Sequence, residues 1–332
     1  VGVDYCLTLN SGTSALHATF LAYGFGLNDE VIVPSFSFIS TANSVSFVGS
    51  TPVFADIEEN TFGLDPKLIP QAISQKTKAI VPMDYGGISC KINQIKEVAQ
   101  SNNLLLIEDS AEALGASVNG KKVGSIADSS IFSFCGNKVL TTGEGGAIVT
   151  NDKAIFEKIK LIRSHGRMDN VRYFENTEQS KYLELGYNWR MSSITAALGI
   201  SQISKLDKII KMRQDNAKYI SQSLSKFPEI ITPSSDRGSE HIYQMYTIRL
   251  SSKKIRDKLH DFLTEKSIFS KIYFSPIHLT DFYRNKFGMK ENSLPLTEMI
   301  SEQILTLPLY PNMTSEEKIY LTESISEFFD SQ

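Results

Sequence analysis

Short apolar segments alternate with helix-forming stretches over the first 150 residues, and this alternation limits the possible folds of the chain most strongly. The segments span four to six residues, are apolar on both faces and are bounded by turn-forming residues, which is typical of buried parallel strands. They lie at 30–34, 51–56, 79–83 and 104–109, with helical patterns at 66–76 and 92–102. This pattern predicts an α/β fold with a mainly parallel central sheet, in which ligands bind at the carboxyl ends of the strands.

The rest of the chain predicts a second, smaller unit. We expect a large domain over residues 1–210 and a small C-terminal α+β domain over residues 211–332. The chain begins almost at once in the apolar segment 6–9, so we also expect its N-terminus to be incomplete. Further expected strands are 130–134, 146–150, 242–250 and 270–274; expected helices are 152–163, 192–224, 254–266, 297–304 and 316–329, with a long loop over 164–187.

Composition argues against several classes of partner. The 34 basic and 37 acidic residues leave a net charge of −3, which gives no electrostatic reason to expect nucleic acid binding. No apolar stretch approaches the roughly 20 residues that cross a bilayer, so we expect no membrane partner. The three cysteines and five histidines show no metal-binding spacing. We therefore predict free thiols, no metal and a cytoplasmic location.

Lys138 and Asp109 carry the chemistry that the sequence predicts. The neighbours of Lys138 are apolar or small, and burial lowers an amine's pKa from its ordinary value of about 10.4. A neutral amine can form a Schiff base. Asp109 ends the apolar segment 104–109, where a buried carboxylate needs a cation such as a protonated pyridine nitrogen. This combination is what pyridoxal 5'-phosphate requires, with a Schiff base to Lys138.

A third segment could bind the phosphate of such a cofactor. Ser11-Gly12-Thr13-Ser14 follows the apolar segment 6–9 and opens a helical pattern. Helix N-termini present free N–H groups to anions, and a glycine lets an anion approach the backbone. An ordinary helix cap explains the same residues. Ser133 could point to the same phosphate or be a structural serine of its strand.

With these segments in place, the chain resembles the DegT/DnrJ/StrS family of pyridoxal-phosphate-dependent sugar aminotransferases over essentially its whole length. The resemblance implies the fold type I of pyridoxal-phosphate-dependent transferases, which is like that of aspartate aminotransferase. Glu112 and the Gly136-Asn137-Lys138 motif are most similar to perosamine synthases, which aminate 4-keto-6-deoxy sugar nucleotides. The matching stretches are 11–17, 34–43, 108–115, 132–146, 186–191, 276–279 and 307–311.

The resemblance also implies individual roles. Phe38 would stack on the pyridine ring, and Glu112 would lie near the ring's 3'-oxygen. The phosphate would be held by Gly12, Thr13 and Ser133. Within a homodimer, Asn188 and Arg190 would reach the phosphate in the neighbouring subunit, and His278 would lie near the substrate. Members of this family carry an N-terminal segment before the position of Val1, and the resemblance implies that this segment helps line the sugar-nucleotide site.

The predicted reaction moves an amino group from glutamate to a keto sugar nucleotide for amino-sugar or surface-polysaccharide biosynthesis. Lys138 would bind the cofactor and transfer the proton, and Asp109 would hold the ring protonated. One alternative is a deoxysugar dehydratase relative, but that branch has histidine at the position of Lys138. Another is a non-catalytic cofactor-binding scaffold. The sequence leaves open which sugar, ring carbon and nucleotide are used.

Overall fold

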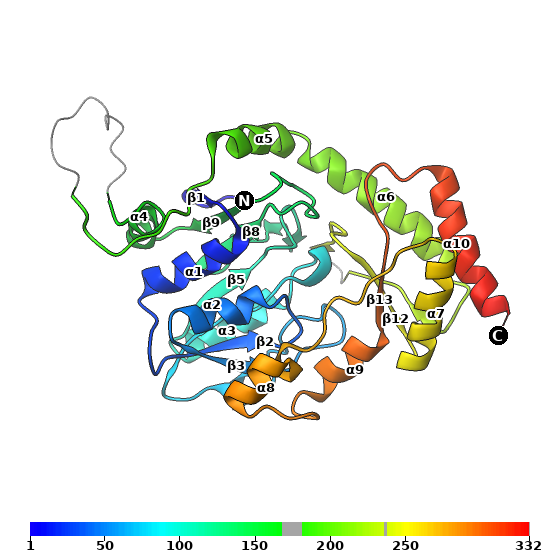
Figure 1. The fold of residues 1–332 in the computed structure, drawn as a ribbon, viewed down its shortest axis with the longest axis horizontal. Helices are drawn as coiled ribbons and strands as arrows, with labels where there is room; N and C mark the ends of the chain where they lie inside the picture. Colours follow the sequence, from blue (N-terminus) through cyan, green and yellow to red (C-terminus); the bar gives the residue numbers. More distant parts are fainter. Residues whose placement is uncertain (168–180, 236–237, 332) are drawn as a thin grey trace.

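A seven-stranded sheet forms the centre of the N-terminal half of the structure, a computed structural model that describes residues 1–167, 181–235 and 238–331 (Figure 1). The strand order is β1-β9-β8-β5-β4-β2-β3. The strands are β1 (Tyr5–Leu9), β2 (Glu30–Pro34), β3 (Thr51–Ala55), β4 (Thr77–Ile80), β5 (Leu105–Asp109), β8 (Ser129–Ser133) and β9 (Gly146–Thr150).

Strand β9 is antiparallel to both of its neighbours, β1 and β8, and every other neighbouring pair is parallel. The remaining strands therefore all run in one direction, and their carboxyl ends meet at one edge of the sheet. The mainly parallel α/β sheet predicted from the alternating segments is confirmed. Segments 9–12, 34–38, 83–86 and 109–112 leave the sheet at this edge, as does the loop after β8, which contains Lys138.

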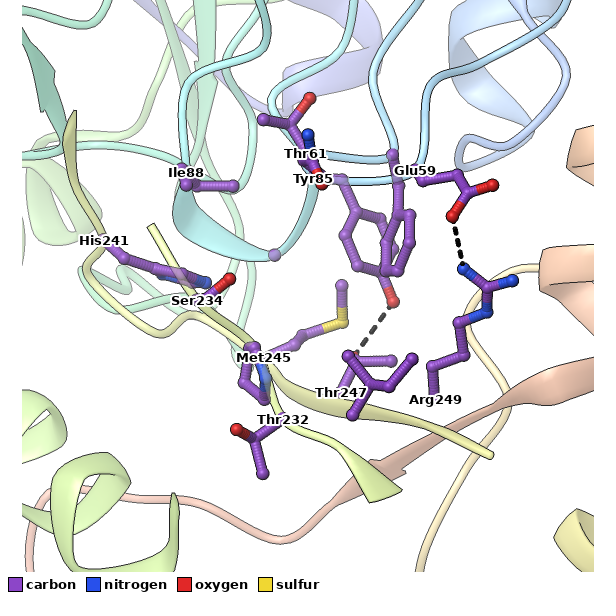
Figure 2. Close-up of a pocket in the computed structure, with 15 residues that line it drawn as sticks. Glu59, Thr61, Tyr85, Ile88, Thr232, Ser234, His241, Met245, Thr247 and Arg249 are labelled. Carbon is purple, nitrogen blue, oxygen red and sulfur yellow. Dashed lines mark hydrogen bonds and ion pairs between the residues drawn. The ribbon is translucent and has the colours of Figure 1, made fainter. Parts of the chain in front are cut away.

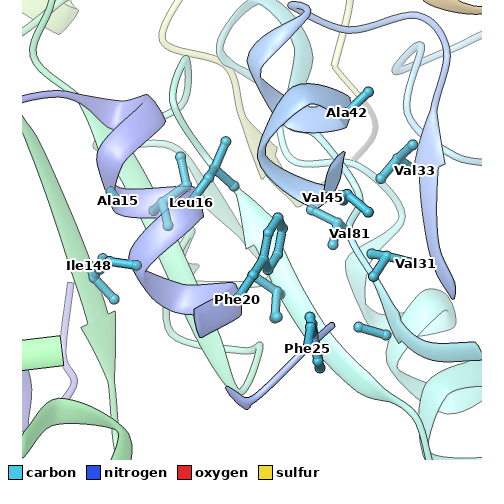
Figure 3. Packing of buried hydrophobic residues seen from close by; sticks show 14 of the residues in the cluster. Ala15, Leu16, Phe20, Phe25, Val31, Val33, Ala42, Val45, Val81 and Ile148 are labelled. Carbon is cyan, nitrogen blue, oxygen red and sulfur yellow. The ribbon is translucent and has the colours of Figure 1, made fainter. Parts of the chain in front are cut away.

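Helices cover both faces of this sheet because its strands are apolar on both sides. Val31 and Val33 pack on one face with Leu16 and Phe20 of α1 and Val45 of α2, as Figure 3 shows. The intervening residue Ile32 belongs to the cluster on the opposite face, which includes α3. The covering helices are α1 (Gly12–Tyr23), α2 (Ser40–Phe47) and α4 (Lys153–Ile162) on the first face and α3 (Ile92–Ser101) on the second.

The C-terminal part forms a separate core around a three-stranded antiparallel sheet of order β10-β12-β13. Helices α6, α7 and α10 supply its apolar side chains. No described helix is both long and apolar enough to cross a membrane. The elements are α5 (Ser193–Ile203), α6 (Leu206–Leu224), β10 (Ile230–Ile231), β12 (Tyr246–Leu250), α7 (Lys253–Glu265), η3 (Ile277–Leu279), α8 (Asp281–Phe287), α9 (Pro295–Gln303), β13 (Ile304–Leu307) and α10 (Ser315–Asp330). A small third sheet joins β6 (Ser117–Val118), β7 (Lys121–Lys122) and β11 (Ser239–Glu240), and a 3-10 turn η2 spans Tyr85–Gly87.

Three expected elements differ from the structure. The helix expected at 66–76 is only a four-residue 3-10 turn, η1 (Ile69–Ala72), because Pro70 supplies no N–H and Ile73 is extended. The single helix expected at 192–224 is broken at Ser204 and Lys205 into α5 and α6. The strand expected at 270–274 forms only one bridge, between Lys271 and Thr306. The expected loop 164–187 lies largely outside the described residues.

Candidate active site

A cavity of about 420 Å³ opens at the carboxyl edge of the central sheet. Its floor comes from the end of β5, the end of β8 and the start of α1, and its outer wall comes from residues 271–274 of the C-terminal part. The structure thus brings segments far apart in the sequence into one site. The predicted site residues that line it are Gly12, Thr13, Phe38, Asp109, Glu112, Ser133 and Lys138.

Lys138 follows a tight turn in the loop between β8 and β9. Its N–H donates to the carbonyl oxygen of Cys135 at 3.0 Å, which closes the turn. The Nζ atom donates to Oε1 of Glu112 at 3.1 Å, and the Lys138 side chain is only 14% exposed. Glu112 is itself held, since its Oε2 accepts from the N–H of Gly86 at 2.9 Å. The amine is therefore directed into the cavity by a buried carboxylate.

Asp109 ends β5 and is almost completely buried. Burial raises the pKa of its carboxyl group, while the hydroxyl of Thr41 and the charge of Lys138 lower that pKa. The hydroxyl of Thr41 donates to Oδ2 at 2.6 Å, and the N–H of Ala111 donates to Oδ1 at 3.3 Å. A buried carboxylate with few donors is strongly stabilised by a cation that binds beside it.

The start of α1 forms an anion-binding end of the cavity. Ser11 caps the helix, and its Oγ accepts from the N–H of Ser14 at 3.0 Å. The N–H groups of Gly12 and Thr13 have no partner within the helix. A Cβ at Gly12 would lie 3.1 Å from Cβ of Ser133, so glycine keeps open the space between this helix end and the Ser133 hydroxyl. Free N–H groups, a hydroxyl and the helix dipole together suit a phosphate.

Aromatic and charged side chains form the outer part of the cavity. Phe38 is 55% exposed, and its ring centroid lies 6.2 Å from that of Phe274. Lys271 and Tyr273 come from the same wall as Phe274. Among the described residues, the ammonium group of Lys271 pairs with no carboxylate, and it lies 5.2 Å from the ring centroid of Tyr273. This wall therefore offers a cation and flat apolar surfaces to a substrate.

Three predicted site residues do not line this cavity. Asn188 is exposed, and Arg190 forms a bridge with Leu9 at the end of β1. Nη1 of Arg190 is buried without a hydrogen-bond partner among the described residues. His278 is fully buried, with Nδ1 2.6 Å from Oγ of Ser35 and Nε2 3.2 Å from Oε1 of Glu298. His278 therefore lies outside the cavity with both ring nitrogens in hydrogen-bond contact, and its place near the substrate stays a prediction.

Comparison with known proteins identifies the family. The model of the DegT/DnrJ/EryC1/StrS aminotransferase family matches residues 1–326. This chain belongs to that family. GDP-perosamine synthase of Caulobacter vibrioides is 38% identical over 316 residues, which cover 94% of this chain and 82% of that protein. Among solved structures, Helicobacter pylori PseC, an aminotransferase of pseudoaminic acid biosynthesis, has a TM-score of 0.93 at 30% identity and covers 100% of this chain and 88% of its own.

Spr1654 of Streptococcus pneumoniae, solved in its PLP form, has a TM-score of 0.92 at 26% identity over 99% of this chain and 88% of its own. The chain is thus a pyridoxal-phosphate-dependent sugar aminotransferase of fold type I. The residues that line the cavity fit that cofactor chemically. It has free N–H groups at the start of α1, where a Cβ at Gly12 would fill the space, a buried carboxylate at Asp109 that forms no ion pair among the described residues, and an amine at Lys138.

Sequence reasoning missed the outer wall of the cavity. Lys271, Tyr273 and Phe274 lie close in sequence to His278, which was expected at the substrate, but they belong to an irregular segment that no short motif marks. Thr41 was also missed as the partner of Asp109. It follows Phe38 by three residues at the start of α2, where a hydroxyl is usually explained as part of a helix cap.

Proposed function

We propose that this enzyme moves an amino group from glutamate to a keto sugar nucleotide of the 4-keto-6-deoxy type. The observation that carries the proposal is that the Lys138 amine and the Asp109 carboxylate line one cavity at the carboxyl edge of the sheet. The similarity to a GDP-perosamine synthase supports the sugar class. Lys271 on the outer wall supports substrates with negative groups, which glutamate and a nucleotide diphosphate both carry.

The residues divide the work by position. When bound, pyridoxal phosphate supplies an aldehyde for amines and a ring that accepts electrons. We propose that Gly12, Thr13 and Ser133 hold its phosphate and that Phe38 covers its ring. Asp109 would hold a proton on the ring nitrogen, because a carboxylate beside a cation regains in attraction part of what burial costs it.

Lys138 would hold the cofactor at rest and then act as a general base and acid. Its amine would take a proton from the carbon that bears the donor's amino group and return it to the cofactor's aldehyde carbon, which lies on the other side of that nitrogen. Proton transfer by a positioned group contributes roughly 10²–10⁴-fold to a rate. Glu112, 3.1 Å from Nζ, orients this amine and accepts its hydrogen bond while it is charged.

The test is a Lys138→Ala variant assayed with glutamate and a panel of keto sugar nucleotides. The proposal predicts loss of turnover for every pair that the wild type uses, in an apo protein that still unfolds cooperatively. A variant with wild-type turnover would remove Lys138 from the mechanism. A wild type that accepts amino groups from glutamate but passes none to any keto sugar nucleotide would overturn the substrate class.

We also propose a division into domains at about residue 210 and a homodimer. The separate C-terminal core supports the division. The dimer is supported by α5, which carries apolar residues on all sides yet buries none of them. Such helices are normally covered by other protein. Ile194 is 84% exposed and Ile200 is 74% exposed, and α5 lies along the outside of the structure in Figure 1.

A second copy of the chain is the proposed partner because Asn188 and Arg190 immediately precede α5. The buried, unpaired Nη1 of Arg190 would find an acceptor in the completed assembly. Ile194→Asp should give a monomer in sedimentation and weaken pyridoxal phosphate binding. The control is Ile231→Asp, which changes an equally apolar residue, 60% exposed, on the C-terminal part. A monomeric wild type with full cofactor affinity would contradict the dimer.

A further inference from the structure

The side chain of Gln244 bridges the two residues on either side of Lys138. Its Oε1 accepts from the N–H of Val139 at 2.7 Å, and its Nε2 donates to the carbonyl oxygen of Asn137 at 2.8 Å. Only one orientation of the amide satisfies both, since the main-chain N–H needs an acceptor and the carbonyl needs a donor. Gln244 is buried, with 7% of its surface exposed. The main chain of Lys138 is thus held from both sides by one side chain.

The segment that carries Gln244 is bound to the turn at Gly86 and Gly87. The N–H of Ile242 donates to the oxygen of Gly87 at 2.9 Å, and the N–H of Met245 donates to the oxygen of Gly86 at 3.0 Å. A Cβ at Gly87 would lie 2.8 Å from the nitrogen of Gln244, and Gly87 has a φ of +104°, so only glycine allows this close approach.

The same turn holds the far end of the Lys138 side chain. The N–H of Gly86 donates to Glu112, and the other carboxylate oxygen of Glu112 accepts from Nζ of Lys138. A continuous set of contacts therefore connects the two ends of Lys138. From its main chain it passes through Gln244 and the adjoining Met245 to Gly86, and from there through Glu112 to its amine. The main chain and the amine of Lys138 are thus both held, through Gln244 and Glu112, by the turn at Gly86.

Neighbouring contacts stiffen this arrangement. Buried Arg213 donates from Nη1 to the carbonyl oxygen of Tyr243 at 2.9 Å. The hydroxyl of Tyr85 lies 3.0 Å from that of Thr247 on β12. Figure 2 shows Tyr85 facing Thr247 close to Met245, beside a small cavity at the junction of the two parts. The segment 243–247 is therefore anchored on both sides of Gln244.

We propose that Gln244 is a positioning residue for the reaction: its amide fixes the main chain of Lys138 so that the amine stands where the cofactor must be attacked. This inference rests on the proposed function of Lys138. Gln244 is buried and is not among the described residues that line the cavity, so its effect is exerted through the main chain on either side of Lys138. A misplacement of about 1 Å can cost on the order of a hundredfold in rate.

Three variants separate positioning from folding. Gln244→Met keeps the size of the side chain and removes both hydrogen bonds. Gln244→Glu keeps the shape but, when ionised, turns a negative oxygen toward the carbonyl of Asn137; when protonated, it can donate there again. The control is Gln214→Met, because Gln214 also donates to the main chain of the same segment, at His241, without touching the neighbours of Lys138.

The experiment mixes each apo protein with pyridoxal phosphate and follows the absorption of the lysine-bound cofactor from pH 6 to 9. Apo unfolding temperatures are measured alongside. We expect Gln244→Met to capture the cofactor about 10- to 100-fold more slowly than wild type at every pH. The rate of Gln244→Glu relative to wild type should rise as the pH falls, because burial favours the protonated acid. Gln214→Met should match the wild type.

Capture by both Gln244 variants within twofold of the wild type would overturn the positioning role. So would a Gln244→Glu rate whose ratio to wild type is independent of pH, since a purely structural loss would not recover on protonation. A wild-type protein that captures no cofactor would instead overturn the proposed function of Lys138, and this inference with it. The two failures are distinguished by the wild-type trace alone.

Discussion

Replacing Thr41 with valine tests the contribution of its hydroxyl to the ionisation of Asp109. The Thr41 hydroxyl donates to Oδ2 of Asp109 at 2.6 Å, and Asp109 is only 3% exposed. Valine has nearly the same shape but no donor. A hydrogen bond to a charged group contributes about 1.5–3 kcal/mol. Each 1.4 kcal/mol is a factor of ten, so pyridoxal phosphate should bind more weakly to Thr41→Val at pH 7, with an upper limit of roughly 10- to 150-fold.

The effect of Thr41→Val on cofactor affinity should depend on pH. Burial already raises the pKa of Asp109, and loss of the Thr41 hydroxyl should raise that pKa further. The protonated acid cannot pair with the ring cation, so cofactor affinity should fall as the pH falls through this pKa. In Thr41→Val the fall should begin at a higher pH than in the wild type.

The assay is titration of apo protein with pyridoxal phosphate between pH 5.5 and 8.5, followed by absorption. Thr41→Ser keeps the hydroxyl and should stay close to the wild type. The reasoning is refuted if Thr41→Val binds as tightly as Thr41→Ser with the same pH dependence.

Three further changes test other parts of the site. Lys271→Gln should raise the KM for an anionic substrate about tenfold with a smaller effect on kcat, because a charged contact is lost. A KM in steady-state kinetics equal to that of the wild type and of the exposed control Lys290→Gln would exclude this contact. Asp56→Ala should lower the free energy of unfolding by about 1–3 kcal/mol in urea titrations, because Asp56 accepts from the N–H and the hydroxyl of Thr297 at the start of α9. An unchanged urea midpoint would contradict the role of Asp56 in capping α9. Gly146→Ala would place a methyl group against the main-chain oxygen of Ser11, so it should displace the start of α1 and weaken binding in the pyridoxal phosphate titration. Wild-type affinity would show that this helix end does not hold the phosphate.

The central sheet could be predicted from sequence because its strands are buried on both faces and leave a continuous apolar signal. Segment 30–34 matches β2, and 104–109 matches β5 to within one residue. The expected helix at 66–76 failed because a helical pattern does not show that the chain forms only a short 3-10 turn at Pro70 and becomes extended at Ile73. The break at Ser204 carries no glycine or proline, so nothing in the local sequence marks it.

The floor of the cavity was also predictable, since a lysine among small residues and an acid at a strand end are visible locally. The contacts that hold them are not. Gln244 is 106 residues from Lys138 in the sequence and meets it only because the C-terminal part packs against the turn at Gly86. The contacts of His278 were likewise not visible locally, since its ring nitrogens meet Ser35 and Glu298, which lie 243 and 20 residues away in the sequence.

Chemical trapping would test the central claim most directly. Apo protein is loaded with pyridoxal phosphate, reduced with borohydride, digested and analysed by mass spectrometry. We predict that the reduced cofactor is attached to the peptide that contains Lys138 and that Lys138→Ala incorporates none. Attachment to another lysine in the folded wild type would contradict the account.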